Sequence, residues 1–233
     1  MDPVTTPCQV WWAAPVAPED APHLLALLDD HEQQRLGRFR RPADTARYLA
    51  AHALTRLVLA DLLGSSPATL IFDRTCRCGQ QHGKPVLAAG GPHFSFTHAG
   101  DLVGLAVHAD VPVGLDVEQI REMNDLPSML RHVCSPAELR VAPPAAPSAF
   151  FRTWTRKEAL LKATGEGLSS PMSAITLNAD GVEDWTGDSS PTVPLWLRDL
   201  RPAAAYPAAV AGFGATAPDV VEADGNAVLS HAG

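Results

Sequence analysis

The sequence predicts an α+β fold, in which short strands and a few helices follow one another in irregular order. The pattern lacks the regular strand–helix alternation that would indicate a doubly wound parallel sheet. Of the 233 residues, 46% are hydrophobic and 19% are charged, so the chain can bury a core and is too apolar for intrinsic disorder. This length suits one large domain or two lobes of roughly 110 residues each.

The N-terminal part of the pattern predicts one strand and two helices. Residues 8–14 are apolar and aromatic and end at Pro15, as expected of a strand. Leucines recur between residues 22 and 36, which predicts one helix there. Residues 43–63 carry leucine and alanine at helical spacing and precede Gly64, a residue type that often ends helices, so this is the clearest helix of the sequence.

Strands dominate the middle of the chain. Apolar and β-branched runs predict strands at residues 69–73, 93–97, 102–108 and 113–118. Residues 98–101 include a glycine and an aspartate and are expected to form a hairpin turn. We place the lobe boundary at residues 109–112, which gives an N-terminal lobe of residues 1–108 and a C-terminal lobe of residues 109–233.

The C-terminal part predicts two helices and three short strands. Ser135 and Glu138 have the spacing of a capping box, which predicts a short helix after Ser135. Ser148 can cap a longer helix at residues 149–164, which Gly165 would end. Short strands are expected at about residues 173–178, 193–197 and 207–212. The residues after Asp224 are small and polar, so we expect them to be frayed.

The composition excludes several classes of protein. The chain has 18 Lys+Arg and 26 Asp+Glu, a net charge of −8, which argues against a generic nucleic-acid binder. The N-terminus lacks the basic and apolar regions of a signal peptide, and proline and glycine interrupt the longest charge-free run. We therefore expect a cytoplasmic protein that binds neither nucleic acid nor a membrane and whose four cysteines are reduced.

Three carboxylates in two motifs are candidate metal ligands. Asp116 and Glu118 lie two residues apart on an expected strand, so both side chains project from the same face. They could be an ordinary solvent-facing edge, or they could bind Mg²⁺, which usually takes one or two carboxylates plus phosphate oxygens. Trp154, Glu158 and Lys162 share a helix face, being four residues apart. These could be a core tryptophan and a surface ion pair, or a third metal ligand and a phosphate-binding lysine.

Basic residues form candidate anion sites. Six arginines against one aspartate between residues 35 and 56 give a local charge of 6 − 1 = +5: Arg35, Arg38, Arg40, Arg41, Arg47 and Arg56. This segment could be a solvated helix face, or it could bind a phosphorylated ligand or an acidic protein. Lys84 lies on an expected turn, which could be a plain solvated turn or could place the lysine at an anion. Thr97 and His98 lie at a strand end that could bind an anion, although His98 could equally be a structural histidine.

A cysteine-rich turn is a weaker candidate. Cys76, Cys78 and His82 could bind Zn²⁺, but a fourth ligand is not evident and the cysteines have C-x-C spacing.

Four blocks of the sequence together resemble the signature of the 4'-phosphopantetheinyl transferases. They are Gly83-Lys84-Pro85, Phe94-Ser95-Phe96-Thr97-His98-Ala99-Gly100, Gly114-Leu115-Asp116-Val117-Glu118 and Trp154-Thr155-Arg156-Lys157-Glu158-Ala159-Leu160-Leu161-Lys162. Thr97 stands where the family often has serine, which keeps the hydroxyl. The resemblance covers residues 83–170, extends more weakly back to residue 35, and fits the long, surfactin-synthetase-activating class. It implies two similar lobes of antiparallel sheet and helices, related by a pseudo-two-fold axis, with the active site at their junction.

The resemblance also implies a reaction and its partners. The phosphopantetheine arm of coenzyme A would be transferred to a serine of an apo acyl or peptidyl carrier protein, releasing 3',5'-adenosine bisphosphate, in polyketide, nonribosomal peptide or fatty acid biosynthesis. Such carrier proteins are generally acidic, and we expect the enzyme to be a monomer with internal pseudosymmetry.

The site residues follow from the same resemblance. Asp116, Glu118 and Glu158 would hold Mg²⁺, with Mn²⁺ as a substitute, and the catalytic residues would be Glu158 as the base, Lys162 and Asp116. Contacts to coenzyme A would come from Arg35, Arg47, Lys84, Thr97, His98, Lys157 and Lys162. The N-terminal lobe would thus bind the 3'-phosphate and adenine, while the C-terminal lobe would carry the metal ligands and the catalytic helix.

Two other functions compete with this interpretation. A Mg²⁺-dependent phosphohydrolase could use the same three carboxylates, but it should hydrolyse coenzyme A without a protein partner. A non-catalytic module that binds carrier proteins could keep the arginines and lack the metal site, and the complete set of carboxylates argues against it.

Overall fold

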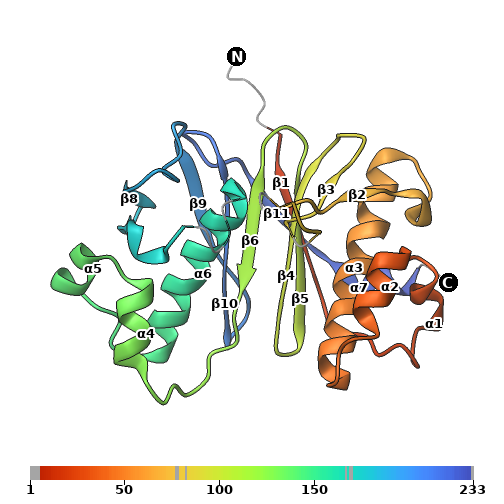
Figure 1. The fold of residues 1–233 in the computed structure, drawn as a ribbon, viewed down its shortest axis with the longest axis horizontal. Coiled ribbons are helices and arrows are strands. Elements are labelled where there is room, and N and C mark those ends of the chain that lie inside the picture. Colours follow the sequence, from red (N-terminus) through yellow and green to blue (C-terminus); the bar gives the residue numbers. More distant parts are fainter. Residues whose placement is uncertain (1–5, 77–78, 82, 166, 168–169, 232–233) are drawn as a thin grey trace. The chain divides into compact units, whose positions relative to one another are not determined.

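The computed structural model describes residues 6–76, 79–81, 83–165, 167 and 170–231 of the chain. The fold is α+β, as expected, and consists of two compact units (Figure 1). The N-terminal unit contains Thr6–Asp110 together with the C-terminal segment from Val220, and the C-terminal unit contains Val111–Asp219. None of the helices in the described part of the chain has both the length and the apolar character to cross a membrane.

The N-terminal unit is built on a four-stranded sheet in the order β11-β1-β5-β4. Its strands are β1 (Cys8–Ala13), β4 (His93–Ala99), β5 (Leu102–His108) and β11 (Val220–Asp224). β1 and β4 both pair antiparallel with β5, and β11 pairs parallel with β1. The expected hairpin is confirmed, since β4 and β5 are joined through Gly100, whose φ of 53° is one that glycine adopts readily.

Helix α3 (Pro42–Leu63) packs against this sheet and supplies the largest share of the N-terminal core. It ends at Gly64 in the left-handed conformation, as the sequence predicted. The expected single helix at residues 22–36 is instead two helices, α1 (Pro22–Leu25) and α2 (Asp30–Leu36). The break has a local cause: Asp29 and Glu32 form a capping box, which starts a new helix.

The N-terminal unit also contains a short antiparallel pair of strands, β2 (Phe72–Asp73) and β3 (Val86–Leu87). The expected strand at 69–73 is shortened because a 3-10 turn, η1 (Pro67–Thr69), occupies its start.

The C-terminal unit is built on a three-stranded antiparallel sheet in the order β6-β10-β9. Its strands are β6 (Val113–Val117), β9 (Leu195–Ala203) and β10 (Tyr206–Phe213). Helix α6 (Pro147–Thr164) lies on β6 and β10 and buries Ala159, Leu160 and Ala163 against them. The helix begins after Ala146 with Pro147 in its first turn, so the expected cap at Ser148 is wrong.

Smaller elements surround α6. They are α4 (Leu126–Val133), α5 (Pro136–Val141), η3 (Met172–Ala174), β7 (Ile175–Leu177) and β8 (Val182–Trp185). The capping box of Ser135 and Glu138 at the start of α5 is confirmed, whereas α4 and β8 were not expected.

The C-terminal segment is ordered where fraying was expected. Strand β11 is followed by α7 (Gly225–Ser230), and Leu229 is buried in the core beside α3. Gly225 approaches β1 closely, because a Cβ atom there would lie 3.0 Å from the carbonyl oxygen of Trp12. Packing of α7 against β1 and α3 therefore orders a segment whose local composition favours disorder.

Candidate active site

Strand β6 and helix α6 approach each other so closely that only glycine fits between them. A Cβ atom on Gly114 would lie 2.0 Å from the carbonyl oxygen of Ala159 and 2.4 Å from the backbone nitrogen of Ala163. Both helix residues belong to the buried core of the C-terminal unit. This contact brings the side chains on one face of α6 within reach of the residues on β6.

Lys162 and Asp116 form an ion pair across this contact. The ammonium Nζ of Lys162 lies 2.7 Å from Oδ1 of Asp116 and donates a second hydrogen bond, of 2.9 Å, to the carbonyl oxygen of Leu115. The side chain of Asp116 is 9% exposed and that of Lys162 is 28% exposed. The pair is thus largely shielded from water, which strengthens its electrostatic interaction.

The three carboxylates singled out in the sequence lie close enough to repel one another. Burial raises the pKa of Asp116 to about 6, with Lys162 opposing the rise and the charges of Glu158 and Glu118 adding to it. Burial also raises the pKa of Glu158, again with Lys162 opposing and Glu118 adding. Glu118 accepts a 2.8 Å hydrogen bond from Arg121, which lies in the irregular segment after β6 and was not expected at the site.

This donor set fits Mg²⁺. Within the described residues, no three His, Cys, Asp or Glu side chains are already arranged around one metal position. The chemistry is nevertheless suitable, because hard carboxylate oxygens that repel one another in a partly buried site are stabilised by a divalent cation. Side-chain rotations would be needed to bring the oxygens of Asp116, Glu118 and Glu158 to one metal position.

Helix α6 continues into an aromatic cluster at its N-terminal end. Trp154 is half-buried and packs near Phe150, at 5.9 Å between ring centroids. It therefore anchors the same helix face that carries Glu158 and Lys162 one and two turns later.

Residues expected to bind the 3'-phosphate lie near both ends of β4 in the N-terminal unit. Thr97 is buried and His98 is exposed at the end of β4, and Arg47 donates a 2.8 Å hydrogen bond to Gly100 in the adjoining turn. Burial and the positive charge of Lys84 lower the pKa of His93, which places Lys84 near the start of the same strand. Lys84 thus lies near the opposite end of β4 from His98.

Lys157 does not fit its expected role as a coenzyme A ligand. Its side chain is fully buried, and Nζ is bound by protein oxygen atoms, including Oε2 of Glu138 at 2.5 Å. An ammonium held in this way does not reach a ligand in solvent. Glu138, which was expected only as part of a helix cap, is the ionic partner of this ammonium.

The arginines between residues 35 and 56 differ in exposure to solvent. Arg35, Arg38, Arg40 and Arg41 are exposed, whereas Arg56 is fully buried. The guanidinium of Arg56 binds Glu32 and Asp29, both at 2.7 Å. Arg56 therefore stabilises the packing of α2 on α3, and the surface charge of the segment is smaller than its sequence suggested.

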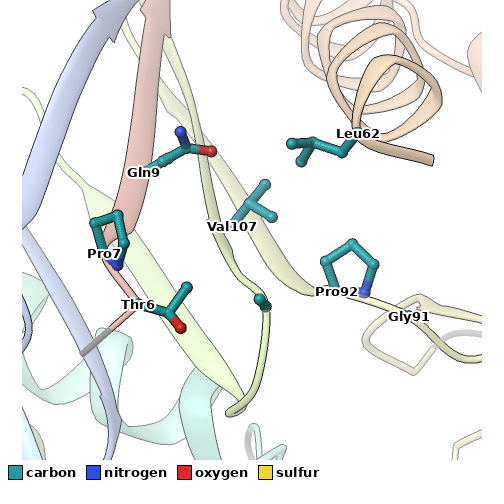
Figure 2. A pocket seen from close by; sticks show the side chains of 8 residues that line it. Thr6, Pro7, Gln9, Leu62, Gly91, Pro92 and Val107 are labelled. Carbon is teal, nitrogen blue, oxygen red and sulfur yellow. The ribbon is translucent and has the colours of Figure 1, made fainter. Parts of the chain in front are cut away.

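Two other features lie apart from these residues. Cys78 and His82 of the expected zinc site lie outside the described residues, so that hypothesis stays a prediction. Figure 2 shows a cavity of about 570 Å³ in the N-terminal unit, lined by Thr6, Pro7, Gln9, Leu62, Gly91, Pro92, Val107 and Ala109. None of the expected site residues lines this cavity.

Comparisons with known proteins identify the family. The model of the 4'-phosphopantetheinyl transferase superfamily matches residues 112–210, and the model of the 4'-phosphopantetheinyl transferase N-terminal region matches residues 12–110. The chain is 34% identical over 202 residues to the 4'-phosphopantetheinyl transferase HetI of Nostoc sp. (strain PCC 7120), covering 82% of this chain and 81% of the relative.

Relatives from Bacillus agree. Identity is 34% over 156 residues to the 4'-phosphopantetheinyl transferase psf-1 of Bacillus pumilus, covering 62% of this chain and 61% of the relative. Identity is 26% over 179 residues to a 4'-phosphopantetheinyl transferase of Bacillus subtilis, covering 74% and 76% of the two chains. The chain therefore belongs to the 4'-phosphopantetheinyl transferase superfamily and is an enzyme of that class.

Proposed function

We propose that this enzyme transfers the 4'-phosphopantetheine arm of coenzyme A to a serine of an apo acyl or peptidyl carrier protein, in a Mg²⁺-dependent reaction that releases 3',5'-adenosine bisphosphate. The observation that carries the proposal is a group of four charged side chains. Asp116 lies on β6 and Glu118 directly follows that strand, while Glu158 and Lys162 lie on α6. Phosphoryl transfer requires charge neutralisation and positioning above all, and this group supplies carboxylates for a metal ion, a cation and a base.

Each residue has a distinct task in this mechanism. Mg²⁺, when bound by Asp116, Glu118 and Glu158, supplies positive charge that stabilises the pyrophosphate. Glu158 would accept the proton of the serine hydroxyl. Lys162 already neutralises a carboxylate at the site and would offer its ammonium to a phosphate oxygen of the substrate.

The bond changes balance without another reactant. The serine oxygen forms a bond to the phosphorus atom of the pantetheine phosphate as its proton passes to Glu158. The bond between this phosphorus and the bridging oxygen of the pyrophosphate breaks, and the electron pair leaves with adenosine bisphosphate. Positive charge near the leaving oxygen lowers the barrier, because negative charge accumulates there.

Binding of coenzyme A is assigned to the N-terminal unit. Arg47, Thr97, His98 and Lys84, together with Arg35, offer guanidinium, hydroxyl, imidazole and ammonium groups, which are the donors that bind phosphate in proteins. Lys157 is left out of this set because its ammonium is buried. An acidic carrier protein would be attracted to the exposed arginines at 38, 40 and 41.

The test is a transfer assay read by intact mass spectrometry. The purified protein is mixed with coenzyme A, MgCl₂ and an apo carrier protein, and the carrier should gain the mass of phosphopantetheine. Removal of the metal with EDTA should stop the reaction, and added Mg²⁺ should restore it. Asp116→Asn should be inactive, whereas Glu183→Gln, which changes an exposed carboxylate on β8, should behave like the unsubstituted protein.

A hydrolase would give a different result. Consumption of coenzyme A in the absence of carrier protein, with no modified carrier in its presence, would contradict the proposal.

A further inference from the structure

A buried lysine lies directly beside the proposed catalytic base. Lys157 is 0% exposed. Its Nζ donates to Oε2 of Glu138 at 2.5 Å and to the carbonyl oxygens of Ile175 at 2.6 Å, Val133 at 2.8 Å and Met172 at 3.3 Å. An ammonium has three protons, so these four acceptors use its full donor capacity.

Both carboxylate oxygens of Glu138 also accept hydrogen bonds from the backbone. Its Oε2 also accepts the backbone N–H of Ser135 at 2.6 Å, and its Oε1 accepts the backbone N–H of Leu177 at 3.0 Å. The carboxylate therefore joins the start of α5 to β7 while it neutralises Lys157. Together with the carbonyl bonds of Lys157, it connects four elements, α4, α5, η3 and β7, to one point on α6.

The position of Lys157 on α6 matters because the next residue is Glu158. Consecutive residues on an α-helix point about 100° apart, so Lys157 and Glu158 face different neighbours. Lys157 faces the buried oxygens, and Glu158 shares with Lys162 the face that meets β6. Gly114 limits how α6 can move against β6 on that face. The rotation of α6 about its axis is thus fixed from two directions.

We propose that the buried Lys157–Glu138 ion pair is a positioning device, which sets the rotation of α6 so that Glu158 and Lys162 face Asp116. This inference rests on the proposed function of Glu158. It replaces the contact between Lys157 and coenzyme A that the sequence suggested. A displacement of about 1 Å at a reacting group lowers a rate on the order of a hundredfold, so a small helix rotation has a large effect.

The chemistry of the pair explains why lysine is suited to this position. Three carbonyl oxygens and a carboxylate converge on a single atom, which a compact ammonium satisfies and the planar fork of arginine does not. A methionine would fill a similar volume but leave these buried acceptors without a donor.

The experiment compares Lys157→Met and Glu138→Gln with a matched control on the same helix. The control is Arg152→Met, which removes an exposed ion pair between α6 and Asp199. Transfer kinetics, the Mg²⁺ concentration for half-maximal rate, and the dissociation constant of coenzyme A without metal are measured for each protein. Thermal melting reports whether each variant folds.

We expect both variants at the buried pair to fold, with kcat reduced about a hundredfold, a higher Mg²⁺ requirement and coenzyme A affinity within about twofold of the unsubstituted enzyme. Lys157→Arg should recover less than a tenth of the activity, and Arg152→Met should retain normal kcat.

Three results would overturn the inference. One is a large loss of coenzyme A affinity at unchanged kcat, which would make Lys157 a ligand. Another is Glu138→Gln folding with normal kcat and Mg²⁺ requirement. The third is loss of the cooperative melting transition in both variants, which would assign the pair to folding alone. Absence of transfer by the unsubstituted enzyme would be distinguishable, because it contradicts the proposed function itself.

Discussion

The ammonium of Lys162 lies 2.7 Å from a carboxylate oxygen of Asp116, so that α6 and β6 are joined by a charge pair at the proposed metal site. The pair balances one negative charge while the burial of Asp116 and the charges of Glu158 and Glu118 still hold its pKa near 6. The site without metal is therefore electrostatically unfavourable.

Asp116→Asn should abolish transfer and raise the melting temperature of the metal-free protein. The folded pKa of about 6 exceeds the ordinary 3.8, so the stability from this group is fully present below pH 3.8 and is lost as pH rises through 6. The neutral amide of asparagine does not ionise, so the variant keeps this contribution to the free energy of unfolding at neutral pH. Each kcal/mol gained should raise the melting temperature by roughly 2–4 °C in calorimetry. A lower melting temperature at pH 7.5 would show that the charge stabilises the fold.

Glu158→Gln should reduce kcat steeply while leaving the binding of coenzyme A nearly unchanged. The substitution keeps the shape of the side chain and removes both the proposed base and a metal ligand. In the metal-free protein, burial raises the pKa of Glu158, so protons compete with Mg²⁺ for this carboxylate, and the Mg²⁺ concentration for half-maximal rate should rise as the pH is lowered. Steady-state kinetics from pH 5 to 9 test both points, and a glutamine variant with normal kcat would remove Glu158 from the mechanism.

Gly114→Ala should destabilise the C-terminal unit and reduce transfer. The added methyl group would lie 2.0 Å from the carbonyl oxygen of Ala159, so α6 must move away from β6. Overpacking of this kind costs about 1–3 kcal/mol or more. Urea denaturation measures the loss, with Gly37→Ala as the control, since a Cβ atom at Gly37 meets nothing closer than 3.7 Å. Equal stability of the two variants would contradict the close contact.

Arg47→Ala and His98→Ala should each raise the Michaelis constant for coenzyme A. Both residues lie near the same end of β4 and are proposed to bind the 3'-phosphate. Charge-assisted hydrogen bonds of this kind are worth about 1.5–3 kcal/mol, or roughly tenfold to a hundredfold in affinity. Dephospho-coenzyme A lacks this phosphate, so the variants should discriminate against it less than the unsubstituted enzyme does. Unchanged discrimination would show that the phosphate is bound elsewhere.

Arg40→Glu combined with Arg41→Glu should raise the Michaelis constant for the carrier protein and leave that for coenzyme A nearly unchanged. Both arginines are exposed, and the chain as a whole has a net charge of −8, so an acidic partner needs a local positive surface. The rate of the carrier reaction should also depend less on salt concentration, because fewer attractive charge pairs remain for salt to screen. The screening length is about 8 Å at physiological ionic strength. A selective loss of coenzyme A binding would instead place these arginines at the nucleotide.

Much of this structure follows from local sequence signals. Helix α3 has leucines at helical spacing and ends at a glycine, and the hairpin of β4 and β5 turns at Gly100. The i,i+4 spacing of Glu158 and Lys162 already places them on one face, because helical geometry is the same in any protein. These features depend on residues within a few positions of one another, so the sequence alone determined them.

The tertiary structure decided the environment of each charge. The sequence shows that Lys157 and Arg56 are basic, but not that Lys157 binds Ile175 or that Arg56 binds Glu32 across 24 residues. It likewise shows a small, polar C-terminus, whereas pairing with β1 orders β11, and packing against α3 and β1 orders α7. A charge or a strand edge gains its stability from whatever lies next to it in space, and those neighbours are distant in the chain. For this reason the sequence determined which residues could carry the chemistry, and only the folded structure decided which of them are buried supports.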